Sequence, residues 1–266
     1  GSFGGINLED ISAPRCFEIE KRLKKDLDIP VFHDDQHGTA VVTAAALLNA
    51  LKIVGKKIED INVVINGAGA AGLAIAKFLL RFGVKDVIVC DSKGILCKGD
   101  SRLNGAKQEV AEMSNKRRVV GSLAAAMKGA DVFVGVSVAN CVSEEMVRSM
   151  AEKAIVFACA NPTPEISREK ALAAGAAVVG TGSSEYPNQI NNVLVFPGLF
   201  RGALDVRAKD INMEMMMAAA QGIASCVSET QLNPDYILPY AYDPKAHEAV
   251  AKAVAQAARD TGVARE

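Results

Sequence analysis

Short and almost unbroken apolar runs alternate with longer segments of helical periodicity from about residue 61 onward. The strand-type runs cover residues 61–66, 86–91, 131–137, 154–160 and 176–180. Strands that are apolar on both faces are typical of parallel sheets whose two sides are both covered by helices. The pattern therefore predicts an α/β fold with a doubly wound parallel sheet and helices on both faces.

Helical periodicity also appears outside these alternating units. The segment that follows the first strand run ends at Gly83, and another begins at Ser143, a suitable N-cap. A buried helix is expected at 38–51, and added C-terminal helices are expected at 211–229 and 243–262. We expect three parts: an opening segment (1–37), a dinucleotide-binding domain (38–230), and a C-terminal linker with its helix (231–266).

Composition narrows the class of protein. Thirty basic residues against thirty-one acidic residues give a net charge of −1, which argues against nucleic acid or an anionic membrane as partner. No apolar run is long enough to suggest a membrane span, and no signal peptide opens the chain. The six cysteines are scattered without a C-x-x-C pair, which predicts free thiols in a reducing cytoplasm.

The loop after the first strand carries glycines in G-x-G-x-x-G spacing, at Gly67, Gly69 and Gly72. A strand before this motif and a helix after it are typical of a Rossmann-like dinucleotide site, where the backbone approaches a pyrophosphate closely. Asp91 ends the next strand, where an acidic side chain accepts hydrogen bonds from a ribose 2′-OH. Asp91 favours NAD, but Lys93 is a suitable partner for a 2′-phosphate, so NAD and NADP both remain open. A plain strand-to-helix turn is the alternative.

Two acidic pairs stand in the first part of the chain: Glu9-Asp10 and Asp34-Asp35. If residues 31–35 are extended, the side chains of Asp34 and Asp35 point to opposite sides. Three carboxylates from two segments would then form a hard oxygen site that suits Mg²⁺ or Mn²⁺. The alternative is that the acids only cap and solvate helix starts. His33 and His37 are not expected to be ligands.

Five motifs occur in the order FGGINLEDI, VFHDDQHGTA, GAGAAG, ANPTPEI and NNVLVFPG. In this order they resemble the malic enzymes, in particular the bacterial type, over essentially the whole chain. The resemblance implies oxidative decarboxylation of L-malate to pyruvate and CO₂, with NAD or NADP and a divalent metal. Carbonyl polarisation by such a metal suits the enolate that decarboxylation leaves.

The resemblance also implies roles for individual residues. Glu9, Asp10 and Asp35 would be metal ligands, and Asp34 would orient a catalytic lysine. The segment Ala68, Gly69, Ala70, Ala71 would lie against the cofactor phosphates. Asn161 would lie near the nicotinamide and the substrate, and Asn192 near the substrate carboxylate.

One part of the family pattern has no counterpart here. The family has an earlier segment with a general-base lysine and a general-acid tyrosine, so we expect a poorly active chain cut just before FGGINLED, with Gly-Ser as a cloning scar. Apolar surface left exposed would favour a homo-oligomer, and we expect a dimer. Two alternatives remain. One is a dinucleotide-binding module without catalysis. The other is another Rossmann-type dehydrogenase, which would not need the two acidic pairs because its hydride transfer requires no metal.

Overall fold

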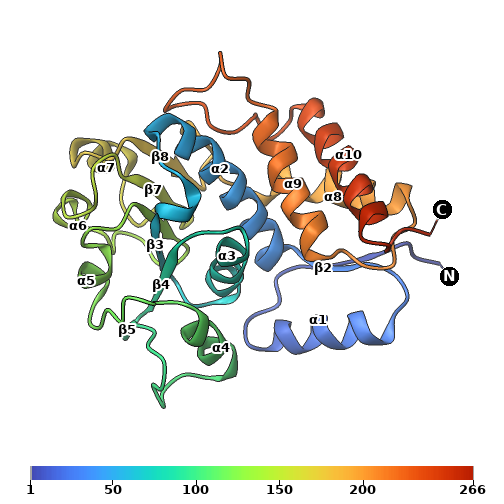
Figure 1. Cartoon of the computed structure of the whole chain (residues 1–266), viewed down its shortest axis with the longest axis horizontal. Helices are drawn as coiled ribbons and strands as arrows, with labels where there is room; N and C mark the ends of the chain where they lie inside the picture. The colour runs from blue at the N-terminus through green and yellow to red at the C-terminus, as the bar shows by residue number, and fades with distance from the viewer. Residues whose placement is uncertain (1, 266) are drawn as a thin grey trace.

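The computed structural model describes residues 2–265 and has a six-stranded sheet at its centre, with strand order β5-β4-β3-β6-β7-β8 (Figure 1). The strands are β3 (Asn62–Asn66), β4 (Asp86–Asp91), β5 (Gly94–Ile95), β6 (Val132–Gly135), β7 (Ile155–Ala158) and β8 (Val178–Thr181). All neighbours are parallel except β5, a short strand that turns back antiparallel onto β4. The predicted doubly wound sheet is confirmed, with this antiparallel edge added.

Alternate residues of the strands enter two separate apolar clusters, one on each face of the sheet. In β3, Val63 and Ile65 belong to one cluster, whereas Val64 belongs to the other. Each strand is thus buried on both sides, which explains its nearly continuous apolar sequence.

Helices cover both faces. The helices that contribute to the larger cluster are α2 (Thr39–Val54), α3 (Ala70–Arg81), α4 (Gly105–Met113), α8 (Phe196–Asp205), α9 (Met213–Ser225) and α10 (Pro244–Asp260). The opposite face carries α5 (Leu123–Met127), α6 (Glu144–Arg148) and α7 (Arg168–Ala173). The predicted C-terminal helices are confirmed as α9 and α10, which pack on each other. Ser143 caps α6 through a hydrogen bond from the Met146 N–H, as expected.

A small two-stranded sheet stands apart from the main one. Strands β1 (Ile6–Leu8) and β2 (Val31–His33) pair in parallel, and α1 (Arg15–Asp26) connects them. Parallel strands end at the same edge of a sheet. The residues that follow β1 and β2, which are the two acidic pairs, are therefore brought to one place.

The segment after β2 is not extended. Asp34–Gly38 forms a π-helical turn (η1) that continues directly into α2. The alternation expected for Asp34 and Asp35 in a strand is therefore wrong. Their side chains still diverge, because consecutive residues of a helical turn also point in different directions.

The expectation that no apolar run could cross a membrane was too strict. The segment Asp34–Val54 has 21 residues and enough hydropathy to pass that test by length and composition. However, 72% of its most apolar window is buried inside the protein, as expected for a core helix. Its apolar side chains contribute to the larger cluster beside α3 and α9.

Candidate active site

The three glycines of the loop between β3 and α3 meet different surroundings. Gly67 has φ +118°, and a Cβ there would lie 2.4 Å from the carbonyl oxygen of Val136. A Cβ on Gly72 would lie 1.7 Å from the carbonyl oxygen of Gly67, whereas a Cβ on Gly69 would meet no heavy atom within 4 Å. Gly67 and Gly72 therefore allow the loop to close on itself. The space beside Gly69 is open to a ligand.

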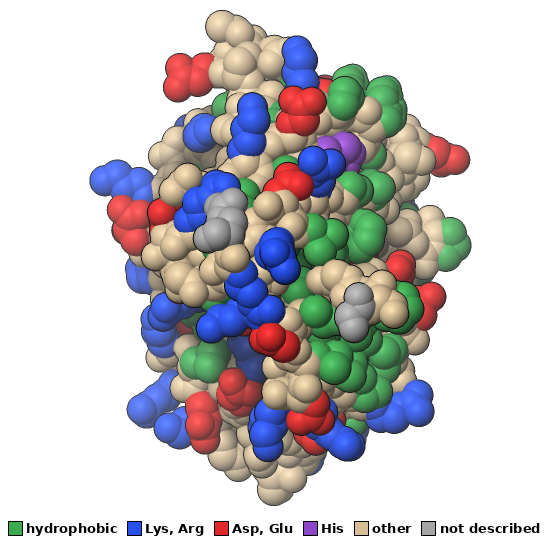
Figure 2. Space-filling view, turned by 90° about the vertical axis from the view of Figure 1, so that its right-hand side faces the viewer, with side chains coloured by type: hydrophobic (Ala, Val, Ile, Leu, Met, Phe, Trp, Pro, Cys, Tyr) green, Lys and Arg blue, Asp and Glu red, His purple; other side chains and the backbone are tan. Residues whose placement is uncertain are grey.

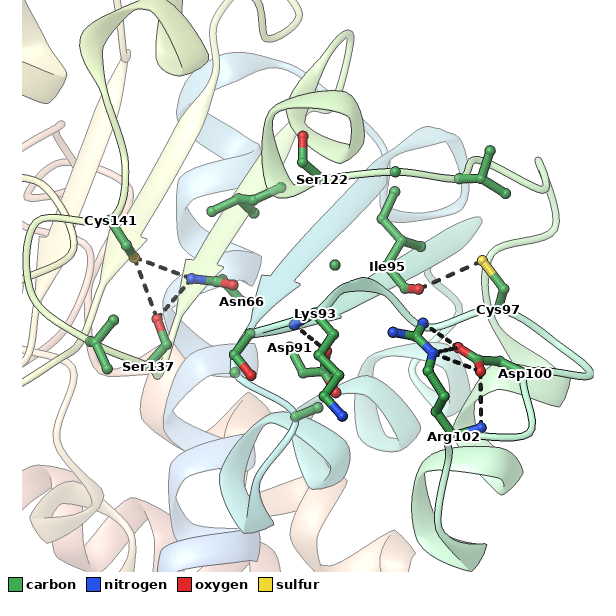
Figure 3. A pocket seen from close by; sticks show the side chains of 18 of the residues that line it. Asn66, Asp91, Lys93, Ile95, Cys97, Asp100, Arg102, Ser122, Ser137 and Cys141 are labelled. Atoms are coloured by element: carbon green, nitrogen blue, oxygen red, sulfur yellow. Dashed lines mark hydrogen bonds and ion pairs between the residues drawn. The ribbon is translucent and has the colours of Figure 1, made fainter.

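A cavity of about 1080 Å³ lies at the carboxyl ends of β3, β4 and β6 (Figure 3). Strand order reverses between β3 and β6, and in open α/β sheets ligands bind at this crevice. Asn66, Gly67 and Ala68 line one side of the cavity, and Asp91 lines another. The predicted cofactor residues Gly67, Ala68 and Asp91 thus share one cavity.

A second cavity, of about 410 Å³, joins the glycine loop to the acidic pairs. Asp10 and Asp35 line it together with the loop Gly69, Ala70, Ala71 and Gly72. The backbone N–H of Asp10 donates to Asp35 Oδ2 at 2.9 Å, which ties the segment after β1 to the turn after β2. Two predicted metal ligands and the predicted pyrophosphate loop therefore face the same space.

The metal prediction fits the structure only in part. The donors are all carboxylate oxygens, which suit a hard divalent cation. Glu9, however, is not among the residues that line this cavity. Within residues 2–265, no three His, Cys, Asp or Glu side chains are arranged to hold a metal ion. The three-ligand set Glu9, Asp10 and Asp35 remains a prediction, and the described residues do not form a complete centre by themselves.

Asp34 is nearly buried, with 6% of the residue exposed. Asn192 Nδ2 donates to its Oδ2 at 2.5 Å, so two residues predicted to act on substrate are in contact. Within residues 2–265, Asp34 Oδ1 has no hydrogen-bond partner. Burial, with smaller contributions from Glu9 and Asp35, raises the pKa of Asp34 to about 6. A Cβ on Gly38 would lie 2.2 Å from Asp34 Oδ1, so this close packing depends on glycine.

The two histidines lie in a hydrogen-bond network behind the acidic turn. Gln36 Nε2 lies 2.7 Å from His33 Nδ1 and donates to Glu20 on α1, which also contacts His37 at 2.7 Å. His33 Nε2 is 3.4 Å from Asp35 Oδ2. This network connects α1 to the turn and supports the position of Asp35.

Asn161 lies apart from these residues. It follows β7, is exposed, and packs so closely on Gly182 that a Cβ there would lie 2.8 Å from its Nδ2. It is not among the residues that line the two cavities in the described chain. Its predicted roles toward nicotinamide and substrate remain predictions.

Sequence reasoning missed Glu165, although it stands in the quoted motif ANPTPEI. Its side chain is fully buried and accepts hydrogen bonds from the N–H groups of Ser137 (2.8 Å) and Ala160 (3.0 Å), and from Ser137 Oγ. Ser137 Oγ in turn accepts from Asn66, the last residue before the glycine loop. Glu165 therefore connects the ends of β6 and β7 to the cofactor loop. A glutamate that follows a proline in a loop gives no local sign of such a role.

Comparison with known proteins identifies the family. Residues 36–259 match the model described as "Malic enzyme, NAD binding domain". The chain belongs to the malic enzyme family. It is 60% identical over 265 residues to the bifunctional malic/malolactic enzyme of Bacillus subtilis, covering 99% of this chain and 65% of that protein. It is 58% identical to the NAD-dependent malic enzyme of Geobacillus stearothermophilus, covering 100% of this chain and 55% of that protein.

Solved malic enzyme structures have the same fold. The malic enzyme from Pyrococcus horikoshii superimposes with a TM-score of 0.95 at 46% identity, over 99% of this chain and 63% of that one. The chain thus spans roughly half to two thirds of the length of these family members. The sequence-based prediction of the family is confirmed.

Proposed function

We propose that this chain provides the cofactor half of a malic enzyme and part of its metal and substrate site. The reaction is oxidative decarboxylation of L-malate to pyruvate and CO₂, with reduction of NAD or NADP. The observation that carries the proposal is the cavity shared by Asp10, Asp35 and the glycine loop. A small hydroxy acid held by the carboxylates through a cation would lie next to the bound dinucleotide, which is the geometry that hydride transfer needs.

The chain's own polar residues suit this substrate. Asn192 is a neutral amide that can donate to a substrate carboxylate without adding charge, and its contact with Asp34 fixes its side chain. The unpartnered Asp34 Oδ1 is an acceptor placed to orient a cationic group such as a lysine ammonium. Both assignments fit the roles that the family motifs imply.

A divalent cation, Mg²⁺ or Mn²⁺, would be held by Asp10 and Asp35 with Glu9. When bound, it would polarise the substrate carbonyl and stabilise negative charge on the adjacent oxygen. We expect Asp35→Asn to weaken Mn²⁺ binding at least about tenfold, because a charged donor is lost from a hard oxygen site. Isothermal titration with MnCl₂ measures this.

Asp60→Asn is the matched control, since Asp60 is an exposed aspartate on the short turn Ile58–Asp60 before β3. It should leave Mn²⁺ affinity unchanged. Equal Mn²⁺ affinity in Asp35→Asn and in the unmodified chain would contradict the assignment of Asp35.

Activity is tested by malate-dependent formation of NADH or NADPH with Mn²⁺, on the 266-residue chain, beside NAD and NADP titrations. We expect dinucleotide binding but turnover at least about 10²-fold below that of an ordinary malic enzyme, because no lysine contacts Asp34 in the described chain. Turnover at an ordinary rate would place the acid and base within this chain. Failure to bind either dinucleotide would overturn the proposal.

A dinucleotide-binding module without catalysis is the second candidate. Dinucleotide binding at the larger cavity needs only the glycine loop and Asp91, which line it without the acidic pairs. Adding the amino-terminal part of a longer relative separates the two candidates, because only a malic enzyme half should then gain malate-dependent turnover.

We further propose a cytoplasmic protein that forms a homodimer. Figure 2 shows hydrophobic side chains gathered on the face that carries both termini. Phe3 (78% exposed) and Leu204 (44% exposed) are exposed apolar side chains, and the segment at Gly4 packs on Leu204. Exposed apolar surface of this kind favours association. All six cysteines are free thiols in the described chain, in keeping with a reducing compartment. Light scattering during gel filtration tests the dimer.

A further inference from the structure

A fully buried imidazole lies directly behind the carboxylate of Asp35. His33 ends β2, is 0% exposed, and places its Nε2 at 3.4 Å from Asp35 Oδ2. Within residues 2–265 this nitrogen has no hydrogen-bond partner, and Asp35 Oδ2 is the charged oxygen that lies beside it. The position of the ring proton therefore decides whether His33 attracts or repels this carboxylate.

The side chains of Glu20 and Gln36 lie on the other side of the ring. Gln36 Nε2 is 3.1 Å from Glu20 Oε2 and 2.7 Å from His33 Nδ1. Burial by itself would raise the pKa of Glu20, but the hydrogen bond to His37 and the positive charges of His37 and Lys24 lower it below its ordinary value. Glu20 is therefore an ionised carboxylate, which can only accept hydrogen bonds.

An ionised Glu20 fixes the orientation of the neighbouring amide. The group of Gln36 that faces a carboxylate must be its NH₂, because an amide oxygen there would be repelled. The same NH₂ group has a second hydrogen, which His33 Nδ1 accepts at 2.7 Å. Because Nδ1 is an acceptor, the ring is neutral and its single proton is on Nε2, on the side of Asp35.

The two oxygens of Asp35 have different surroundings. Oδ2 accepts from the Asp10 N–H at 2.9 Å and lies beside His33, whereas Oδ1 has no hydrogen bond or ion pair among the described residues. We propose that Glu20, Gln36 and His33 form a relay of positioning residues that holds Asp35 Oδ2 and leaves Oδ1 free for the cation. Groups that hydrogen-bond a metal-ligating carboxylate orient it and support metal affinity. The inference rests on the proposed metal site and names the residues that prepare it.

The relay can be tested without a metal ion. The chain has three histidines, and the ¹⁵N chemical shifts of labelled imidazoles distinguish a protonated ring nitrogen from an unprotonated one. The signals that disappear in His33→Gln belong to His33, and we expect them to show a neutral ring protonated at Nε2. A His33 ring protonated at Nδ1 would overturn the inference.

Two substitutions at the same position test the effect on the cation. A glutamine amide reaches about as far as Nε2 of the histidine it replaces and can donate to Asp35, whereas an asparagine amide reaches only as far as Nδ1. We expect His33→Asn to weaken Mn²⁺ binding about tenfold and His33→Gln to weaken it no more than about threefold, measured by isothermal titration. Both variants lose the packing of the ring, so equal Mn²⁺ affinity in the two would overturn the inference.

Glu20→Gln tests the first residue of the relay. It keeps the shape of the side chain but removes the charge that orients Gln36, so we expect Mn²⁺ binding to weaken at least about threefold. Neither Glu20 nor His33 lines the two cavities that the glycine loop borders, so affinity for NAD and NADP should not change. A purely structural role would instead lower the urea midpoint and all three affinities together.

Glu18→Gln is the matched control, because Glu18 is an exposed glutamate on the same helix, α1. It should leave Mn²⁺ affinity unchanged, and equal Mn²⁺ affinity in Glu18→Gln and Glu20→Gln would contradict the role of Glu20. If the unmodified chain bound no Mn²⁺, the proposed metal site would fail, and the NMR result distinguishes that failure from an error in the relay.

Discussion

Gly72→Ala is expected to abolish NAD and NADP binding and to lower the free energy of unfolding by about 3 kcal/mol. The added Cβ would lie 1.7 Å from the Gly67 carbonyl oxygen, and both groups belong to the backbone of one tight loop. The conflict cannot be relieved by turning a side chain. The loop must open, and it then moves away from the position that a pyrophosphate needs. Urea unfolding and dinucleotide titration measure the two effects.

Gly69→Ala, in the same loop, is expected to weaken dinucleotide binding without a large change in the stability of the fold. Its φ of −90° and ψ of −162° are open to any residue, and its Cβ would meet nothing within 4 Å. We expect the urea midpoint to change little, while dinucleotide affinity falls at least about tenfold because the methyl group occupies space left for the phosphates. Unchanged affinity in Gly69→Ala would mean that the pyrophosphate does not approach this residue.

Glu165→Ala is expected to lower the free energy of unfolding by about 3 kcal/mol, since it leaves the partly buried N–H groups of Ser137 and Ala160 without an acceptor. We also expect weaker dinucleotide binding. Ser137 lines the larger cavity and accepts a hydrogen bond from Asn66, so releasing Ser137 also loosens the start of the glycine loop.

Glu165→Gln refines this test. It keeps the shape of the side chain but offers one acceptor oxygen, and its NH₂ group would face an N–H donor. The free energy of unfolding of Glu165→Gln should therefore lie between that of Glu165→Ala and that of the unmodified chain. The control is Glu229→Ala, at an exposed position in the loop after α9. If Glu165→Ala and Glu229→Ala unfold at the same urea concentration, the buried carboxylate does not hold the strand ends.

The main sheet could be predicted because its signal is local. Residues 86–91 are apolar on both faces, and the predicted strand coincides with β4 (Asp86–Asp91). The glycine loop was predictable from spacing for the same reason. The pairing of β1 with β2 escaped prediction because each strand has three residues and its partner lies 25 positions away, so no periodicity marks the pair.

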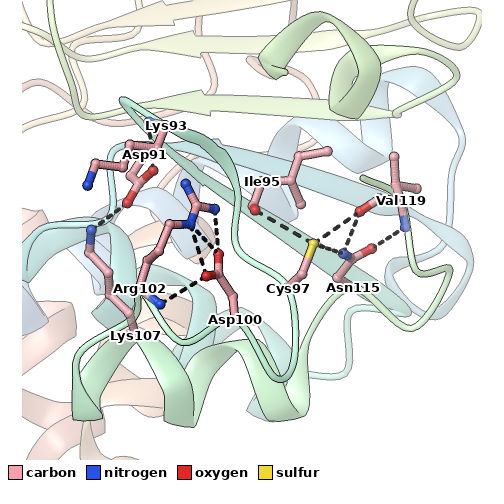
Figure 4. Close-up of polar contacts among 9 residues, drawn as sticks. All are labelled: Asp91, Lys93, Ile95, Cys97, Asp100, Arg102, Lys107, Asn115 and Val119. Carbon is pink, nitrogen blue, oxygen red and sulfur yellow. Dashed lines mark hydrogen bonds and ion pairs between the residues drawn. The ribbon is translucent and has the colours of Figure 1, made fainter. Parts of the chain in front are cut away.

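At the candidate site, too, only the features marked by nearby residues in the sequence could be predicted. The motifs predicted that Asp10, Asp35 and the glycine loop carry the chemistry, and the structure places them around one cavity. The extended conformation expected for Asp34 and Asp35 is wrong because the helical turn begins at Asp34, in polar residues that precede the apolar pattern of α2. The ion pair between Asp91 and Lys107 (Figure 4) and the hydrogen bonds of Glu165 depend on segments that meet only after folding.

The turn Asp34–Gly38 has a mechanical consequence. It contacts α3 and runs without interruption into α2, which packs against α3 and α9. The turn that carries Asp35 and the helix that follows the glycine loop are therefore packed directly against each other. The distance between Asp35 and the glycine loop should therefore stay the same when the chain binds a dinucleotide.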